Sequence, residues 1–284
     1  MSRPDSVIPF EKLPPGFAET LRDPPAEPVA ARPAATIVLM RDGTQGSEVL
    51  LLRRNRTAGF VPGAYVFPGG RVDGADGRPA LVERTDGLTP ERAEERLDHA
   101  DGTPPAIAFY LAAVREAFEE TGILVGRRAD GSHPPTAAES DRVDRVRDDL
   151  MEDRLTFAEA LERLECRVEG AAVEYLAHWI TPVVEPRRYD TRFFAAAVPP
   201  GSEAIVDPRE MTDALWIAPE AALERNRDGA LPMVFPTLKT LERLARYGDV
   251  TATLDALGSR RVPAILPRLV TTPTGVGMEL DHEP

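Results

Sequence analysis

The chain has few of the features that mark secreted, thiolate-metal or membrane proteins. Its single cysteine, Cys166, excludes an intrachain disulfide and offers no spacing for a cysteine-based metal site. No apolar run approaches the roughly 20 residues that a membrane-spanning helix needs. The N-terminal residues also lack the apolar core of a secretory signal. We therefore expect a cytoplasmic protein that works in a reducing compartment and does not enter the membrane.

Positive charge is scarce as well. The sequence holds 34 Lys and Arg residues against 47 Asp and Glu residues, which gives a formal net charge of −13. Because a strongly acidic surface repels phosphate backbones, nonspecific binding to nucleic acid or to an anionic membrane is not expected. An anionic substrate must instead be held by a metal ion and a few arginines. The 284 residues are enough for one large domain or two modest ones.

Three carboxylates are grouped on one predicted helical turn. Glu116, Glu119 and Glu120 are spaced i, i+3 and i+4, so on a helix they share one face. Such a run alone is typical of a solvated helix face. Here Arg115 lies four residues before Glu119 and can hold that carboxylate, and Gly122 follows the run. Clustered carboxylate oxygens suit a hard divalent cation such as Mg²⁺ or Mn²⁺, which also removes their mutual repulsion.

Two segments together resemble the signature of the Nudix hydrolases. Residues Arg115–Ile123 (REAFEETGI) match its second half, and Gly70, at the end of the FPGG segment, matches its first glycine. In the family this glycine precedes the arginine by 14 positions, whereas here the separation is 45, so about 31 residues are inserted. The family's isolated glutamate would fall at Ile107. The residues that could take its role instead are Asp73, Asp98 and Asp101.

The resemblance implies a fold, a reaction and a metal site. A Nudix hydrolase is an α/β protein with a mixed sheet between helices, an α/β/α sandwich. It hydrolyses the pyrophosphate bond of a nucleoside diphosphate linked to another moiety. The implied metal ligands are Glu116, Glu119, Glu120 and Gly70, and the three glutamates with Arg115 are the implied catalytic set. The general base is either a glutamate of this run or an acidic loop residue, for which the candidates are Glu203 and Glu210.

A second resemblance concerns the substrate. Residues 50–70 (LLLRRNRTAGFVPGAYVFPGG) are similar to the signature of the coenzyme A diphosphatases of this family, with Arg54 at its first arginine. The second arginine would fall at Gly59, and Arg56 is the nearest alternative. The long insertion is similar to that of the peroxisomal coenzyme A diphosphatase type. Coenzyme A or acyl-coenzyme A is therefore the expected substrate. The alternatives are ADP-ribose, NADH or a nucleotide sugar, or a non-catalytic module that binds a nucleotide.

Basic side chains strengthen the prediction of a phosphate-containing substrate. A basic cluster in an acidic chain can be a set of solvated arginines on a hairpin, or it can bind phosphate, because guanidinium groups match phosphate oxygens and stay charged. The predicted substrate-binding residues are Arg53, Arg54, Arg56, Gly69 and Gly70. A second basic group, Arg187, Arg188 and Arg192, is an alternative contact. The aromatic residues that could stack on a base, although such residues are more often core, are Phe60, Tyr65 and Trp179.

Composition divides the chain into three parts. Residues 1–33 are rich in proline and are expected to form an irregular arm. Residues 34–247 are expected to form the Nudix domain, with the insertion at about 74–105. Residues 248–284 form a C-terminal extension with an extra helix. The insertion could form a lid over the pocket or cover the sheet edge, and homodimerisation stays open.

Apolar periodicity locates the main elements. Strands are expected at 34–40, 48–53, 65–67, 176–183, 191–198 and 214–217. Helices are expected at 89–100, 105–121, 141–166, 219–227 and 236–247. Thr89 is the predicted cap of the first of these helices, and Gly122 is predicted to end the second.

Overall fold

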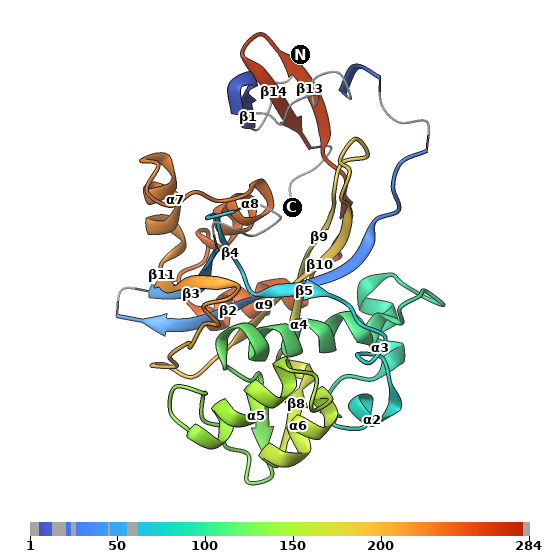
Figure 1. Ribbon diagram of the computed structural model, residues 1–284, viewed down its shortest axis with the longest axis vertical. Coiled ribbons are helices and arrows are strands. Elements are labelled where there is room, and N and C mark those ends of the chain that lie inside the picture. Colours follow the sequence, from blue (N-terminus) through green and yellow to red (C-terminus); the bar gives the residue numbers. More distant parts are fainter. Residues whose placement is uncertain (1–5, 13–20, 24–26, 45, 56–61, 281–284) are drawn as a thin grey trace.

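A mixed sheet of eight strands forms the centre of the computed structural model, which describes residues 6–12, 21–23, 27–44, 46–55 and 62–280 (Figure 1). The strand order is β11-β3-β2-β10-β9-β12, with β4 paired to β3 and β5 paired to β2. β2 runs parallel to β10 and antiparallel to β3. The strands are β2 (Arg32–Gly43), β3 (Gly46–Arg54), β4 (Tyr65–Val66), β5 (Gly69–Arg71), β9 (Glu174–Ile180), β10 (Tyr189–Ala197), β11 (Met211–Ile217) and β12 (Ala264–Ile265).

Helices cover both faces of this sheet, which confirms the predicted α/β/α sandwich (Figure 1). One apolar cluster joins the sheet to α4 (Ala106–Thr121). A second cluster joins the opposite face to α7 (Pro219–Arg227), α8 (Phe235–Leu244) and α9 (Val250–Gly258). The predicted helices at 105–121, 219–227 and 236–247 are thus present.

The helix α4 is enclosed on nearly all sides. Fourteen of its 16 residues are buried, which its alanine-rich, apolar sequence permits because a helix apolar all round belongs in a core. Its outer side is covered by the insertion and by the segment that follows the helix. The covering elements are α2 (Pro79–Val82), β6 (Thr85–Asp86), α3 (Pro90–Leu97), β7 (Gly126–Arg128), α5 (Asp141–Met151), α6 (Phe157–Leu164), β8 (Cys166–Glu169) and the short 3₁₀ helix η2 (Gly170–Ala172).

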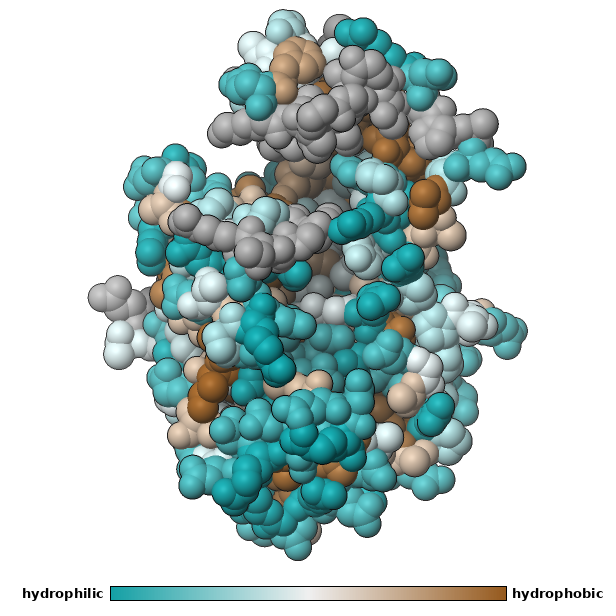
Figure 2. All heavy atoms as spheres, in the orientation of Figure 1, coloured by the Kyte–Doolittle hydropathy of each residue, from teal (hydrophilic) through white to brown (hydrophobic). Residues whose placement is uncertain are grey.

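The insertion packs against the outer side of α4. Its strand β6 joins β8 and β7 in a separate three-stranded sheet, and α3 contacts α4. A Cβ on Gly77 would lie 2.8 Å from Cγ of Pro105, so the insertion leaves and returns at the same place. The chain before the insertion therefore still lies next to the start of α4. The insertion and the segment that follows α4 form a lower lobe in Figure 1, and hydrophilic side chains dominate its visible surface (Figure 2).

The helical prediction for 141–166 is partly wrong. The structure divides it into α5 and α6, and α6 ends at Leu164 because Glu165 adopts a left-handed conformation with φ 55°. Cys166 therefore begins the strand β8 and lies in the core. The predicted cap of the helix in the insertion is confirmed, since the Thr89 side chain caps α3 and accepts a hydrogen bond from the Arg92 N–H.

The two ends of the chain meet in a further three-stranded sheet, drawn at the top of Figure 1. The strands are β1 (Ser6–Pro9), β14 (Gly275–Glu279) and β13 (Arg268–Thr272), and the short 3₁₀ helix η1 (Phe10–Lys12) follows β1. The prediction of an irregular arm missed β1, and the predicted C-terminal helix is α9, with three strands after it. Within the described ranges, no helix has both the length and the apolarity to cross a membrane.

Candidate active site

The three glutamates occupy the last two turns of α4. The helix begins after Pro105 and ends at Gly122, whose left-handed conformation (φ 71°) lets its N–H return to the Phe118 carbonyl. Both ends agree with the predicted helix. Glu116, Glu119 and Glu120 consequently share one face, as their spacing requires.

A glycine corner lies directly against this face. β5 pairs with β2 so that Gly70 is opposite Ala35, and the Gly69 N–H donates to Oε2 of Glu120 at 2.9 Å. A Cβ on Gly70 would overlap the carboxylate of Glu116, and one on Gly69 would lie 2.5 Å from the Ala35 carbonyl oxygen. Only glycine lets the β5 backbone approach both the helix and β2 this closely.

Arg115 joins the corner to the helix. Its NH1 donates to Glu116 at 3.0 Å and to Glu119 at 2.9 Å, and its NH2 donates to the Arg71 carbonyl at 3.0 Å. Its Nε and NH2 also bond both carboxylate oxygens of Asp76, at 2.8 and 3.1 Å. Burial alone would lower the pKa of Arg115, but the bonds to Asp76 and the charges of the glutamates raise it. Arg115 is therefore always a cation, and it orients two of the three glutamates.

Asp76 is the acidic partner that the sequence reasoning missed. The candidates were Asp73, Asp98 and Asp101, yet Asp73 approaches Arg115 only to 3.7 Å and Asp98 pairs with Arg261 at the surface. Asp101 lies in the turn after α3, and Ile107 is in the core. The signal was available, since Asp76 follows Gly70 at the spacing that the family signature gives its glutamate. Counting back from Arg115 failed because most of the inserted residues lie between Asp76 and Arg115.

The glutamates carry more negative charge than Arg115 can balance. Burial, with the charges of neighbouring acids, raises the pKa of Glu116 despite Arg115. Burial raises the pKa of Glu119 to about 7, against the lowering effect of Arg115. Burial and the charge of Glu116 raise the pKa of Glu120 well above its ordinary value, although the Gly69 N–H opposes this. Desolvated carboxylates with raised pKa values need a further cation to be ionised at neutral pH.

The donor set fits a hard divalent cation. It consists of carboxylate oxygens from one helix face beside a backbone corner, which is the chemistry that Mg²⁺ and Mn²⁺ prefer. Across the ranges that the structure covers, no three acidic, histidine or cysteine side chains are arranged as a complete metal cage. The reason is visible in the contacts: Arg115 draws Glu116 and Glu119 together, while Glu120 faces Gly69.

The predicted substrate arginines do not act as one cluster. Arg53 and Arg54 are consecutive on β3, so their side chains leave opposite faces of the sheet. The guanidinium of Arg53 lies 5.7 Å from the ring centroid of Tyr65, whereas the charge of Arg54 lowers the pKa of Glu120 and so belongs to the carboxylate side. The Nε atoms of both are buried with no hydrogen-bond partner in the described residues. Arg56 lies outside those residues.

One of the two candidate bases acts electrostatically on the glutamates. The charge of Glu210 contributes to the raised pKa of Glu120. The Asn55 N–H donates to the Glu210 carbonyl at 2.9 Å, which ties this loop to the end of β3 beside Arg54. Glu203 instead lies 3.6 Å from Arg41.

The second basic group is not brought to the carboxylates. Arg188 donates to the carbonyls of Thr181 and Val29. Arg192 is buried between β10 and α4, where it contacts Tyr175 and His178. Both arginines therefore have structural partners. Arg187 is exposed in the loop before β10.

The aromatic candidates also have structural positions. Tyr65 and Trp179 are buried, as their more common core role predicts, and Phe60 lies outside the described residues. His178 accepts a hydrogen bond from Arg192 within the core.

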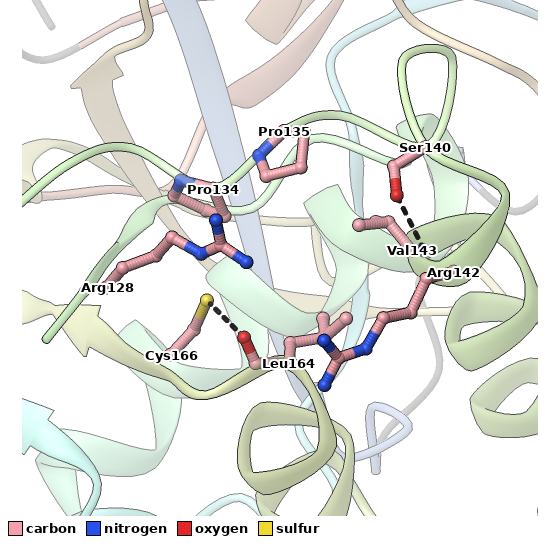
Figure 3. Close-up of a pocket in the computed structure, with 8 residues that line it drawn as sticks. All are labelled: Arg128, Pro134, Pro135, Ser140, Arg142, Val143, Leu164 and Cys166. Atoms are coloured by element: carbon pink, nitrogen blue, oxygen red, sulfur yellow. Dashed lines mark hydrogen bonds between the residues drawn. The ribbon is translucent and has the colours of Figure 1, made fainter.

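A small pocket on the lower lobe is unrelated to this site. Figure 3 shows its lining side chains, with Arg128 directed over Cys166 and Ser140 directed at Val143 at the start of α5. None of the lining residues belongs to β5 or α4. Burial raises the pKa of the Cys166 thiol, so it is not activated as a nucleophile.

Comparison with known proteins agrees with the geometry. Residues 29–244 match the family model described as the NUDT19 Nudix domain. The human acyl-coenzyme A diphosphatase NUDT19 is 30% identical over 240 residues, which cover 73% of this chain and 63% of that protein. The protein of the same name from Xenopus laevis is 26% identical over 238 residues, covering 74% and 63%. The chain thus spans less than two thirds of the length of these relatives.

A solved structure gives the same result for the fold. The crystal structure of a Nudix hydrolase from Alicyclobacillus acidocaldarius superposes with a TM-score of 0.67 at 27% sequence identity. The match covers 80% of this chain and 97% of that one. The sandwich around α4 is therefore similar in both.

Proposed function

This chain belongs to the NUDT19 Nudix-domain family of Nudix hydrolases, and from that premise we propose that it is a metal-dependent diphosphatase of coenzyme A or acyl-coenzyme A. One observation carries the catalytic part of the proposal: three glutamates with raised pKa values, Glu120 buried and the other two half-buried, face a glycine corner, and Arg115 is the cation that contacts two of them. The substrate part is supported by the names of the relatives and by the partial coenzyme A signature around Arg54.

Glu116, Glu119, Glu120 and the backbone at Gly70 would hold Mg²⁺ or Mn²⁺. When bound, such an ion neutralises phosphate charge and makes water a stronger acid. Arg115 keeps the Glu116 and Glu119 carboxylates on the side of the corner, and the Gly69 N–H keeps Glu120 there.

Arg54 and Glu210 complete the proposed machinery. Arg54 would bind a phosphate oxygen, because its Nε is buried without a partner in the described residues and a guanidinium matches phosphate. Glu210 would take the proton from the attacking water, because it is the loop carboxylate whose charge contributes to the raised pKa of Glu120. The new P–O bond then forms as the bridging P–O bond of the diphosphate breaks.

The test is to identify the products. The protein is incubated with coenzyme A, an acyl-coenzyme A, ADP-ribose, NADH and a nucleotide sugar in ¹⁸O-labelled water with Mn²⁺, and the product masses are measured. We expect adenosine 3′,5′-bisphosphate and a 4′-phosphopantetheine, with ¹⁸O in one of them. Glu119→Gln should lose turnover by about 10³-fold, since the glutamates act as one unit.

Three outcomes would reject the proposal. Preferential hydrolysis of ADP-ribose, NADH or a nucleotide sugar would move the substrate to the alternative class. Equal activity of Glu119→Gln and the wild type would remove the glutamate site itself. Tight binding of a nucleotide without turnover would indicate a binding module.

A further inference from the structure

The last turn of α4 is anchored from outside the helix. The final carbonyls of a helix have no partner within it. Here the Glu119 carbonyl accepts a hydrogen bond from Nε of Arg147 at 2.8 Å, and the Thr121 carbonyl accepts one from the Ile205 N–H at 2.9 Å. Arg147 comes from α5, and Ile205 from the loop that leads to Glu210. The turn that carries two of the glutamates is therefore held by tertiary contacts.

Arg147 is a cation whose burial is incompletely compensated. It is 3% exposed, its NH1 lies 3.7 Å from Asp144, and its NH2 is buried without a hydrogen-bond partner in the described part of the chain. Burial lowers the pKa of Arg147, against the opposing charges of Asp144, Asp148, Asp207 and Glu119. An apolar side chain of similar length would avoid this desolvation. Packing therefore does not explain why a guanidinium stands here.

Two arginines donate hydrogen bonds to Glu119, one to its side chain and one to its backbone. Arg115 holds its carboxylate at 2.9 Å, and Arg147 holds its carbonyl at 2.8 Å. Because the carbonyl and side chain belong to one rigid turn, fixing the carbonyl also fixes the direction of the Glu119 and Glu120 carboxylates. A small displacement of such groups has a large effect on a reaction that depends on their position.

We propose that Arg147 is a positioning residue for the metal-binding carboxylates. Its hydrogen bond to the Glu119 carbonyl fixes the last turn of α4 against the glycine corner and thereby sets the affinity for the divalent cation. This inference rests on the proposed metal-dependent function. It does not depend on which diphosphate is the substrate.

The charge of Arg147 and its hydrogen bond have opposite effects on the affinity for the divalent cation. A positive charge near the glutamates repels a divalent cation, so its loss alone would tighten metal binding. Loss of the hydrogen bond would weaken it. The glutamine side chain separates the two effects, because its amide nitrogen occupies the same place along the side chain as Nε of arginine. Arg147→Gln can keep the donor and lacks the charge, whereas Arg147→Met lacks both.

The experiment measures Mn²⁺ binding to the full chain without substrate, by the loss of the electron paramagnetic resonance signal of free Mn²⁺. We expect Arg147→Met to raise the Kd by about 10-fold or more, which is typical for loss of a residue that orients metal ligands. Arg147→Gln should bind as tightly as the wild type or more tightly. Arg145→Met, on the exposed side of α5, is the matched control and should bind as the wild type does.

Turnover adds a second measurement that a general loss of stability would not mimic. Arg147→Met should regain most of its kcat at high Mn²⁺, and its KM for the diphosphate should stay near that of the wild type. The proposal is overturned if Arg147→Met binds Mn²⁺ as the wild type does, or if Arg147→Gln is as weak as Arg147→Met. Should Arg147→Met fail to fold, weak binding by folded Arg147→Gln is enough to overturn it. Failure to hydrolyse coenzyme A, with these Mn²⁺ affinities as expected, would reject only the proposed substrate.

Discussion

The two ends of α4 each carry a buried group of charged side chains, and the groups are built differently. At the C-terminal end, Arg115 faces Asp76, Glu116 and Glu119, and in the described residues Glu120 has only the Gly69 N–H as its hydrogen-bond partner. At the N-terminal end, beside Phe109, the cation Arg192 faces His178 and Asp190, and Arg96 pairs with Glu174. The first group has an excess of negative charge, whereas the second is balanced.

Hydrogen bonding explains the balance at the N-terminal end. NH1 of Arg192 lies 2.6 Å from Nδ1 of His178. Because a guanidinium can only donate hydrogen bonds, this Nδ1 must be the acceptor and carries no proton. His178 is therefore neutral and donates its Nε2 proton to Asp190 at 2.5 Å. Burial would raise the pKa of Asp190, but the bond from His178 and the charge of Arg192 lower it overall. A lowered carboxyl pKa marks the structural group here, and raised values mark the proposed metal site.

The largest expected effect concerns the loop beside the unbalanced end. Glu210→Gln should lower kcat by about 10³-fold, because it removes the proposed base. Glu203 lies in the same loop, but its carboxylate pairs with Arg41. Glu203→Gln should therefore leave kcat unchanged. Steady-state kinetics at saturating Mn²⁺ measures both. Equal losses in the two variants would contradict the assignment.

Removal of one carboxylate from each group compares their contributions to stability. Asp76→Asn should cost about 3 kcal/mol, because it leaves Arg115 buried with one of its main bonds broken. Asp190→Asn should cost about 1 kcal/mol, since Asp190 is 30% exposed and the amide oxygen can still accept from His178. Urea unfolding of the metal-free proteins gives both values. A larger loss for Asp190→Asn would reverse the comparison.

Gly70→Ala tests the close approach at the unbalanced end. The added Cβ overlaps the Glu116 carboxylate, so that ligand must move, and kcat/KM should fall by about 100-fold. Gly74→Ala, four residues on, meets no atom within 4 Å and is the matched control. Full activity of Gly70→Ala would show that the Glu116 carboxylate does not need to lie against Gly70 during the reaction.

A smaller effect than the loss of Asp76 is the pH dependence of the metal-free protein. The pKa of Glu119 is raised to about 7 in the folded state from 4.5, so the folded protein binds more protons than the unfolded chain between these values. Stability should therefore fall as pH rises through this window, by about 2 kcal/mol from about pH 5 to about pH 7. Saturating Mn²⁺ should remove most of this loss. Thermal unfolding across this pH range, with and without Mn²⁺, measures it, and stability that rises with pH would contradict the account.

The sequence predicted what depends on local spacing. The i, i+3, i+4 pattern of the glutamates, the Arg115–Glu119 pair and the glycine end of α4 are all present, because they depend on one helix. Six strands of the main sheet, β2, β3, β4, β9, β10 and β11, were predicted for the same reason, since their apolar runs lie within single segments, whereas β5 and β12 were not predicted.

The sequence did not predict what depends on the packing of distant segments. Asp76 was missed because the insertion separates it from Arg115 by 39 positions, and folding brings the two together. The sorting of Arg53 and Arg54 to opposite faces needed the register of β3. Arg147 and His178 carry no motif, and their roles exist only through contacts with α4 and β10.

The most direct test of the central claim is a crystal structure with Mn²⁺ at a wavelength where manganese scatters anomalously. The account predicts an anomalous peak at about 2.1 Å from carboxylate oxygens of Glu116, Glu119 and Glu120, next to Gly70. It would be contradicted by a protein saturated with Mn²⁺ in which the peak lies away from this face, with Arg115 still holding Glu116 and Glu119.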